Sequence, residues 1–166
     1  MKNICDYLHY NPNTGVFTWV LKPSRRISAG SIAGSPHRRS GYRKIKFDGQ
    51  DYRANRLAWF FVHGAWPCAC LDHRNGRKDD DRIDNLREAS SAQNAMNRRA
   101  VVNSSSAHKG VTYHKQMRKW QAQIKVAGKN KYLGLFASES AAALAYNNAA
   151  AVAHEQFARL NEVRAS

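Results

Sequence analysis

The C-terminal third of the chain carries the pattern that most restricts its fold. Apolar and polar residues alternate strictly over residues 120–126, which is the period of a half-buried β-strand. Two further strand-like runs, residues 110–114 and 131–136, lie on either side of it. Ser138 then stands where it can cap an alanine-rich helix over about residues 139–155, whose small side chains allow a close approach to a sheet. The segment therefore predicts a three-stranded antiparallel sheet packed on one helix.

The rest of the chain predicts a small N-terminal sheet followed by two helices. Residues 16–20 follow a turn rich in Asn, Pro and Gly, and residues 42–47 lead into a hairpin turn at Asp48-Gly49. Helices are expected over residues 53–62 and about 91–98. The whole reads as an α+β protein in four parts: an N-terminal β region at 1–50, a core at 51–100, a serine-rich linker at 101–107 and a sheet-and-helix domain at 108–166.

The charge of the chain indicates a polyanionic partner. Lys and Arg number 27 against 12 Asp and Glu, a formal net charge of +15. Residues 1–103 carry 18 basic against 9 acidic residues and residues 104–166 carry 9 against 3, so both halves are basic. Because such self-repulsion destabilises a fold, we expect nucleic acid as the partner, with a merely soluble basic protein as the alternative. Candidate contacts in the basic segments are Arg38, Arg39, Arg43, Lys44, Lys46, Arg98, Arg99 and Lys115.

The three cysteines, Cys5, Cys68 and Cys70, are an odd number without the spacing of a disulfide framework. Cys68 and Cys70 could form half of a zinc site, but no second Cys or His pair lies at a ligand-like spacing, so structural zinc is disfavoured. The N-terminus lacks the apolar core of a signal peptide, and the longest apolar run, residues 57–62, is too short to span a bilayer. We expect a cytoplasmic protein with no membrane partner.

A short polar segment carries the groups that phosphodiester hydrolysis requires, namely a base for the attacking water and oxygen ligands for a cation at the phosphate. His73 suits the base because imidazole titrates near physiological pH. Asp72 points the other way if the two lie on a strand, so it can bind the metal. Asn94 offers a second oxygen ligand, and this donor set favours Mg²⁺ over Zn²⁺. Asn85 lies in a turn where its amide can tie the backbone of the His73 loop.

Each of these residues also has an ordinary interpretation. An isolated Asp-His pair is most often solvated at the surface, and Asn85 and Asn94 alone are typical of turns and helix caps. The acidic run Asp79-Asp80-Asp81 is expected to be a loop that keeps this segment off DNA, with a second metal site as the alternative. The combination of residues, rather than any one of them, favours a catalytic site.

The spacing of Asp72-His73, Asn85 and Asn94, with the lead-in Asn55-Arg56-Leu57-Ala58-Trp59, resembles that of the HNH nucleases over roughly residues 50–99. More specifically, it resembles the phage and intron-type homing endonucleases, in which asparagine replaces the last histidine. The resemblance implies two β-strands and a helix around one metal ion. It also implies a bacterial or phage-infected cell.

The same resemblance implies a role for each matching residue. His73 would be the general base, Asp72 and Asn94 the ligands of Mg²⁺, with Mn²⁺ as a substitute, and Asn85 the residue that braces the loop. Asp81 is a departure, because many relatives carry asparagine before the arginine that matches Arg82. We expect little effect of this departure on the chemistry.

Residues 108–161 resemble AP2-type DNA-binding domains, in which a sheet lies in the major groove and a helix packs behind it. The likeness rests on Lys109-Gly110-Val111 and on residues 119–124, 132–136 and 141–146. Carried over by position, the DNA contacts are Lys109, Thr112, His114, Gln121, Gln123, Lys125, Asn130 and Tyr132. The alternation supports this independently, because it leaves the Gln and Lys side chains of residues 121–125 on one face, where they can read bases.

These predictions describe a site-specific, metal-dependent DNA endonuclease of the homing type that acts on double-stranded DNA as a monomer and nicks one strand. The resemblance implies 5′-phosphate and 3′-hydroxyl products. The alternative is a DNA-binding transcriptional regulator with a vestigial nuclease centre, which the intact set of His73, Asp72 and Asn94 disfavours. An RNA-binding protein is disfavoured because the predicted strands lack an exposed aromatic platform for base stacking.

Overall fold

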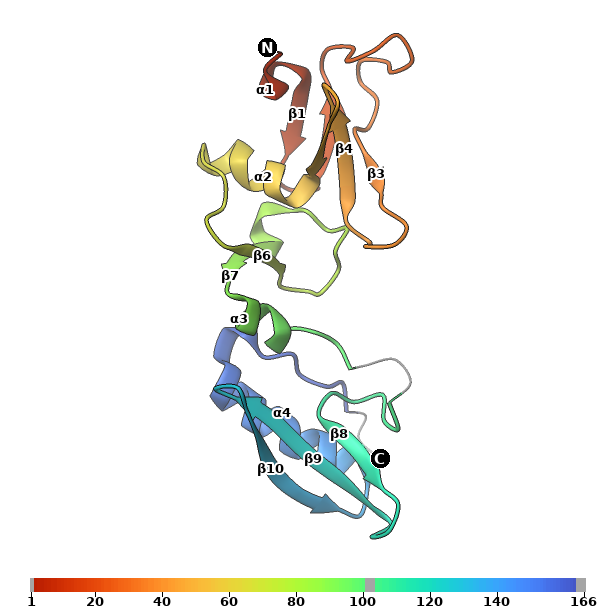
Figure 1. Ribbon diagram of the computed structural model, residues 1–166, viewed down its shortest axis with the longest axis vertical. Helices are drawn as coiled ribbons and strands as arrows, with labels where there is room; N and C mark the ends of the chain where they lie inside the picture. Colours follow the sequence, from red (N-terminus) through yellow and green to blue (C-terminus); the bar gives the residue numbers. More distant parts are fainter. Residues whose placement is uncertain (1, 101–103, 164–166) are drawn as a thin grey trace. The chain divides into compact units, whose positions relative to one another are not determined.

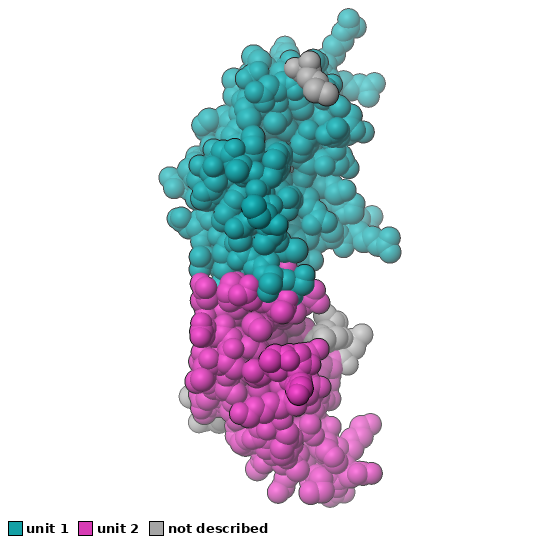
Figure 2. All heavy atoms as spheres, turned by 60° about the vertical axis from the view of Figure 1, so that its left-hand side comes forward, with its two compact units in different colours: residues 1–91 teal, residues 92–166 magenta. Residues whose placement is uncertain are grey.

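The computed structural model describes residues 2–100 and 104–163 (Figure 1). The chain divides into two compact units between Ser91 and Ala92, which are coloured separately in Figure 2. Both units combine short helices with small antiparallel sheets, and this agrees with the predicted mixed α and β class. The finer division into four parts stays a prediction.

The first unit starts with a short helix, two antiparallel sheets and a longer helix: α1 (Ile4–Tyr7), β1 (Leu8–Asn11), β2 (Val16–Trp19), β3 (Ser35–Pro36), β4 (Arg43–Phe47), β5 (Gln50–Arg53) and α2 (Ala54–His63). Strand β1 pairs with β2, and β4 is the central strand of the β3-β4-β5 sheet. Helix α2 ends at His63, one residue beyond the predicted end, because Gly64 adopts a φ of 70°, the left-handed conformation that terminates many helices.

One apolar core joins the strands of the N-terminal region to the segment that follows them. Phe17 and Ile45 are fully buried, and they belong to the same cluster as Leu57 of α2 and Leu86 farther along the chain. Phe17 also meets the ring of Phe61 edge-on, with centroids 5.3 Å apart. Helix α2 therefore buries its apolar side against the N-terminal sheets and becomes the base on which the next hairpin rests.

That next element is a two-stranded antiparallel hairpin, and it carries the candidate site. Its strands are β6 (Cys70–His73) and β7 (Leu86–Ala89), with a short 3-10 helix, η1 (Ile83–Asn85), before the second strand. Helix α3 (Ser91–Met96) follows and is two residues shorter than predicted. The order of strand, strand and helix is the one that the HNH resemblance implies, whereas a shared metal site stays a prediction.

The turn between β1 and β2 packs against the loop that joins β6 to β7. Gly15, in this turn, adopts a φ of 71°. A β-carbon there would lie only 2.5 Å from the backbone nitrogen of Arg82 and 2.6 Å from the carbonyl carbon of Asp81. Glycine therefore permits both the left-handed conformation and the close approach. The loop at Asp81 is held from outside the hairpin as a result.

The second unit contains the sheet and helix that the alternation predicts. Its strands β8 (Val111–His114), β9 (Lys119–Val126) and β10 (Lys129–Phe136) form an antiparallel sheet in the order β10-β9-β8. Helix α4 (Glu139–His154) packs on this sheet, with η2 (Glu155–Phe157) after it (Figure 1). The Oγ of Ser138 accepts a hydrogen bond from the backbone of Ala141 at 3.1 Å, so this residue caps α4 as predicted.

Small residues allow the helix and the sheet of the second unit to approach closely. Ala142, Ala143 and Ala150 of α4 are fully buried. Gly110, just before β8, has a φ of 76°, and a β-carbon there would overlap the ring of Tyr146. The predicted packing of an alanine-rich helix on three strands is confirmed, while the likeness to AP2 domains stays a prediction.

Residues 101–103 of the predicted linker lie outside the described residues, but the end of that segment is bonded to the second unit. Ser106 donates to the carboxylate of Glu139 at 2.6 Å, and Ser105 accepts from the backbone of Tyr113 at 2.9 Å. Cys5, Cys68 and Cys70 form no disulfide bond. No helix in the described part of the chain has both the length and the apolarity to cross a membrane.

Candidate active site

His73 lies buried at the end of β6, with 4% of its surface exposed. Its Nε2 is 3.1 Å from Oδ1 of Asp81, whose side chain is only 1% exposed. Burial raises the pKa of Asp81, whereas the hydrogen bond and the charge of His73 act to lower it. The other oxygen, Oδ2, is buried without a hydrogen-bond partner among the described residues, which agrees with desolvation as the largest effect. The histidine is therefore held by a carboxylate in a site shielded from solvent.

The expectation of an exposed acidic loop is wrong for Asp81. The hydroxyl of Tyr10 donates to the backbone carbonyl of Asp81 at 2.7 Å, and the turn at Gly15 packs on the same backbone. These contacts pin the loop from one side, and the carboxylate turns inward to His73. Asp79 alone of the triplet behaves as expected, since it is exposed and only 3.5 Å from Arg77 in a surface ion pair. The residue expected to have little effect on the chemistry is thus the direct partner of the histidine.

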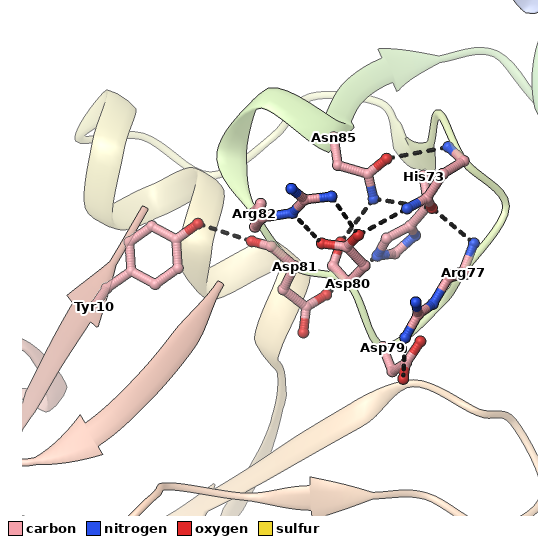
Figure 3. Close-up of polar contacts among 9 residues, drawn as sticks. Tyr10, His73, Arg77, Asp79, Asp80, Asp81, Arg82 and Asn85 are labelled. Atoms are coloured by element: carbon pink, nitrogen blue, oxygen red, sulfur yellow. Dashed lines mark hydrogen bonds and ion pairs between the residues drawn. The ribbon is translucent and has the colours of Figure 1, made fainter. Parts of the chain in front are cut away.

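Asn85 lies at the centre of a hydrogen-bond network that shapes the loop after His73 (Figure 3). Its Oδ1 accepts from the backbone of Asn75 at 3.0 Å, and its Nδ2 donates to the carbonyl of Asp80 at 2.8 Å. Both carboxylate oxygens of Asp80 accept from Arg82 at 2.8 Å, and this contact lowers the pKa of Asp80 to about 2. Asn85 makes the loop contacts that were predicted, and a contribution to catalysis stays a prediction.

Asp72 is as buried as His73, and it faces a cation across the hairpin. The guanidinium of Arg87 donates to Oδ2 of Asp72 from Nε at 2.9 Å and from Nη2 at 2.7 Å. The two residues are directly opposed on β6 and β7. Because Asp72 and His73 are both buried, they are not the solvated surface pair that an isolated Asp-His dipeptide suggests.

An aromatic ring from the N-terminal region also lies against the histidine. The centroids of the Tyr42 and His73 rings are 5.8 Å apart. The charged groups of Arg53 and Lys78 each lie 5.1 Å from the centre of the Tyr42 ring, and Lys78 also donates to the carbonyl of Ser40 at 3.0 Å. Two positive charges are thus gathered on the ring that packs on His73, which suits a site for a phosphate group. The sequence has no local signal for these contacts, because they join distant segments.

The hairpin and its flanking elements are similar to a known family. Residues 52–96 match the model of the HNH endonucleases. The matched segment runs from β5 to the end of α3 and includes Asp72, His73, Asn85 and Asn94. The match supports an HNH nuclease, which is a hydrolase with DNA as its substrate. No solved structure matches the chain.

HNH nucleases typically use a divalent metal ion, and the carboxylate of Asp72 is a suitable donor for a hard cation. No three His, Cys, Asp or Glu residues of the described ranges form a cluster that could hold a metal. A site made of one carboxylate and one carboxamide would not form such a cluster. Asn94, the other predicted ligand, lies on α3 in the second unit, so its pairing with Asp72 stays a prediction.

The predicted DNA contacts of the first unit are partly engaged within the protein. Arg43 donates to the carbonyl of Gly34 at 3.1 Å, and Lys44 lies 3.5 Å from the carboxylate of Asp51. The exposed members of the set are Arg38, Arg39 and Lys46. These basic side chains come just before the segment that matches the HNH endonucleases, which agrees with a protein that acts on DNA.

Six of the predicted contacts in the second unit share one face of the sheet. They form the cross-strand pairs Thr112 with Gln121, Gln123 with Tyr132, and Lys125 with Asn130. Directly opposed residues project to the same side of a sheet, and the alternate residues of β9 are buried toward α4. His114 lies on the same strand as Thr112, two residues on, so it falls on this face as well.

The remaining predicted contacts have different surroundings. Arg98, Arg99 and Lys115 are exposed. Lys109 is half-buried and donates to the backbone carbonyls of Ala95 and Met96 in α3. A contact between Lys109 and DNA would therefore compete with these two hydrogen bonds.

Proposed function

We propose that the protein is a site-specific, metal-dependent endonuclease of the homing type that cuts double-stranded DNA, with His73 as its general base. The observation that carries this proposal is the bond between His73 and Asp81, which lies in the segment that matches the HNH endonucleases. An imidazole whose orientation is held by a carboxylate is suited to accept the proton of an attacking water.

Asp81 would determine which nitrogen of His73 acts as the base. With Asp81 ionised, Nε2 carries the hydrogen of their bond, so the lone pair of the neutral ring is on Nδ1. In this proposal Nδ1 accepts the proton from water, and Asp81 stabilises the imidazolium that results. Asn85 and Tyr10 support this step indirectly, because they hold the loop that carries Asp81.

Asp72 and Asn94 would hold the metal ion, Mg²⁺ or its substitute Mn²⁺, which when bound neutralises charge on the phosphate and on the departing 3′-oxygen. The oxygen donors of these two residues support this assignment. Arg87 opposes it in part, because its guanidinium already neutralises the Asp72 carboxylate. Metal binding and the Arg87 ion pair should therefore compete.

The second unit would supply site selection. Gln121 and Gln123 have the amide groups that pair with adenine, and Lys125 can contact guanine or a phosphate. Their common face with Tyr132 and Asn130 supports a base-reading surface. We propose a monomer that nicks one strand. Each chain has one candidate active site, at His73, and a single site cuts one strand at a time. Its place of action would be the cytoplasm of a bacterial or phage-infected cell.

Incubation of the protein with supercoiled plasmid or phage DNA and Mg²⁺ tests the proposal. The intact protein should convert supercoiled to open-circular DNA, and His73→Ala should abolish this conversion. His9→Ala is the matched control, since His9 is exposed on β1 and should be dispensable. If linear DNA forms without an open-circular intermediate, the protein cuts both strands instead of nicking one. Cleavage that persists in His73→Ala would reject His73 as the base.

The Arg87 ion pair is the one observation that favours the alternative, a DNA-binding regulator with an inactive centre. If Arg87 keeps Asp72 from binding metal, the protein should bind DNA tightly without cutting it. Calorimetric titration with Mg²⁺ in the presence of uncleaved DNA separates the two functions. Specific DNA binding with neither metal uptake nor cleavage would establish the regulator.

A further inference from the structure

The second unit contains a cavity of about 450 Å³. Its apolar wall includes Met96 of α3 and Ile124 of β9, and Tyr146 and His154 of α4 line it as well. Lys125, also in the lining, is exposed, so the cavity can be reached from solvent. Small-molecule sites in proteins have volumes of roughly 300–1,000 Å³, so this one is large enough for an organic ligand.

Two polar side chains of the wall are buried without full hydrogen bonding. Tyr146 is 2% exposed, and its hydroxyl has no hydrogen-bond partner among the described residues. His154 is 5% exposed, and its Nε2 lies 2.9 Å from the carbonyl of Lys125. A carbonyl can only accept, so Nε2 carries the hydrogen, and Nδ1 of the neutral ring is an acceptor. This Nδ1 is likewise buried and lacks a partner within the described ranges.

Positive charge is concentrated at one side of the cavity. The ammonium of Lys109 lines it and donates to the carbonyls of Ala95 and Met96, which uses two of its three N–H groups. Burial and, to a smaller extent, the nearby charges of Arg159 and Arg98 together lower the pKa of Lys109 to about 8. Such a concentration of cations is relieved by an anion.

We propose that this cavity binds one nucleotide, with the base against the apolar wall and the phosphate beside Lys109. The edge of a base carries N–H donors for Nδ1 of His154 and its faces are apolar, while the oxygens of the attached sugar and phosphate can accept from the hydroxyl of Tyr146. These two residues are eight positions apart on α4, about 12 Å along the helix axis at 1.5 Å per residue. A base with its sugar and phosphate suits that span better than a base alone.

The same chemistry is offered by a free nucleotide and by a nucleotide unpaired from a DNA strand, which would be extruded at a cost in stacking. The proposal does not depend on whether His73 cuts DNA. Binding can therefore be measured with full-length protein in the absence of Mg²⁺, so a failure here would leave the proposed nuclease function untouched.

The first experiment titrates the protein with each of the four deoxynucleoside monophosphates and follows the ring signals of Tyr146 and His154 by NMR. At least one nucleotide should shift both signals, and the matching nucleoside, which lacks the phosphate, should bind more weakly. Tyr146→Phe should weaken binding about tenfold, because it removes one hydrogen bond. Its thermal midpoint should not fall, since the lost hydroxyl has no partner in the described protein. Tyr113→Phe, at an exposed site outside the cavity, is the control.

The second experiment distinguishes the two sources of the nucleotide. A duplex that carries one unpaired 2-aminopurine is added to the protein, and its fluorescence is followed. A change that Tyr146→Phe abolishes would assign the ligand to the DNA strand, whereas binding of monophosphates without this change would assign it to the free nucleotide. The proposal is overturned if neither ligand moves the Tyr146 and His154 signals at millimolar concentration, or if Tyr146→Phe binds as tightly as the parent protein.

Discussion

Replacement of Asp81 tests directly whether a buried carboxylate oxygen holds the proposed general base. Asp81→Leu removes the acceptor that lies 3.1 Å from Nε2 of His73. It places an apolar side chain of similar size in this buried position. Asp81→Asn keeps one oxygen acceptor and removes the charge. Asp79→Asn, two residues earlier in the same acidic run, is the matched control, because Asp79 is exposed and has only a surface partner.

The expected magnitude follows from the bond that is lost. A hydrogen bond to a charged group contributes about 1.5–3 kcal/mol. Since about 1.4 kcal/mol corresponds to a factor of ten in rate, Asp81→Leu should slow cleavage roughly 10- to 150-fold. Asp81→Asn should retain the rate within about tenfold, because its amide oxygen can still accept from Nε2 and an amide is less costly to bury than a carboxylate.

The assay is single-turnover nicking of plasmid at saturating Mg²⁺, with thermal unfolding of each variant to confirm that it is folded. Asp79→Asn should cut at the parent rate. A folded Asp81→Leu variant that also cuts at the parent rate would refute the argument that Asp81 orients His73. If Asp81→Asn falls as far as Asp81→Leu, the negative charge rather than the acceptor oxygen is what His73 requires.

Three further changes test the surroundings of the site. Arg87→Met removes the cation that faces the buried Asp72 carboxylate, so the free energy of unfolding in urea should fall by about 3–5 kcal/mol. Mg²⁺ should partly restore it, and an unchanged free energy of unfolding would show that the ion pair does not stabilise the fold. Asn85→Ala removes three side-chain hydrogen bonds, at about 1 kcal/mol each, so the free energy of unfolding should fall by about 2–3 kcal/mol and cleavage should slow. Asn13→Ala, at an exposed turn, should change neither the free energy of unfolding nor the cleavage rate. Lys109 has a pKa of about 8 in the folded chain against about 10.4 when unfolded, so the unfolded chain binds more protons between these two values and the free energy of unfolding should rise from about pH 8 to pH 10. Lys109→Met should lose this rise, and a variant that keeps it would contradict the assignment to Lys109.

The elements that could be predicted from the sequence are those that depend on neighbours in the chain. Alternation over residues 120–126 and the position of Ser138 suffice for β9 and α4, because strand period and helix capping are local properties. The differences are at the ends, as at α3, which stops at Met96. The packing of Phe17 with Leu86 in one core could not be predicted, because it depends on how distant segments fold together.

The candidate site divides along the same line. Residue types and spacing identify His73 and Asn85, and the structure places both in one hydrogen-bonded hairpin. Strand register determines that Arg87 faces Asp72, and loop packing determines that Asp81 faces His73. Neither can be predicted from a local sequence pattern. An acidic triplet has the same appearance in a sequence whether its members are solvated or buried, so the difference between Asp79 and Asp81 emerges only in the folded chain.

The residues that shape the His73 site extend beyond the segment that matches the HNH endonucleases. The segment that matches the HNH endonucleases starts at residue 52, yet three of the contacts that shape the histidine site come from before it. Tyr10 holds the backbone of Asp81, Gly15 leaves room for the same loop, and Tyr42 packs on the ring of His73. A histidine that acts as the proposed base needs an orientation fixed to within a fraction of an ångström, and for His73 that orientation depends on residues outside the matched segment. The N-terminal sheets are therefore part of the structure that makes the HNH residues usable, in addition to being a basic surface that can meet DNA.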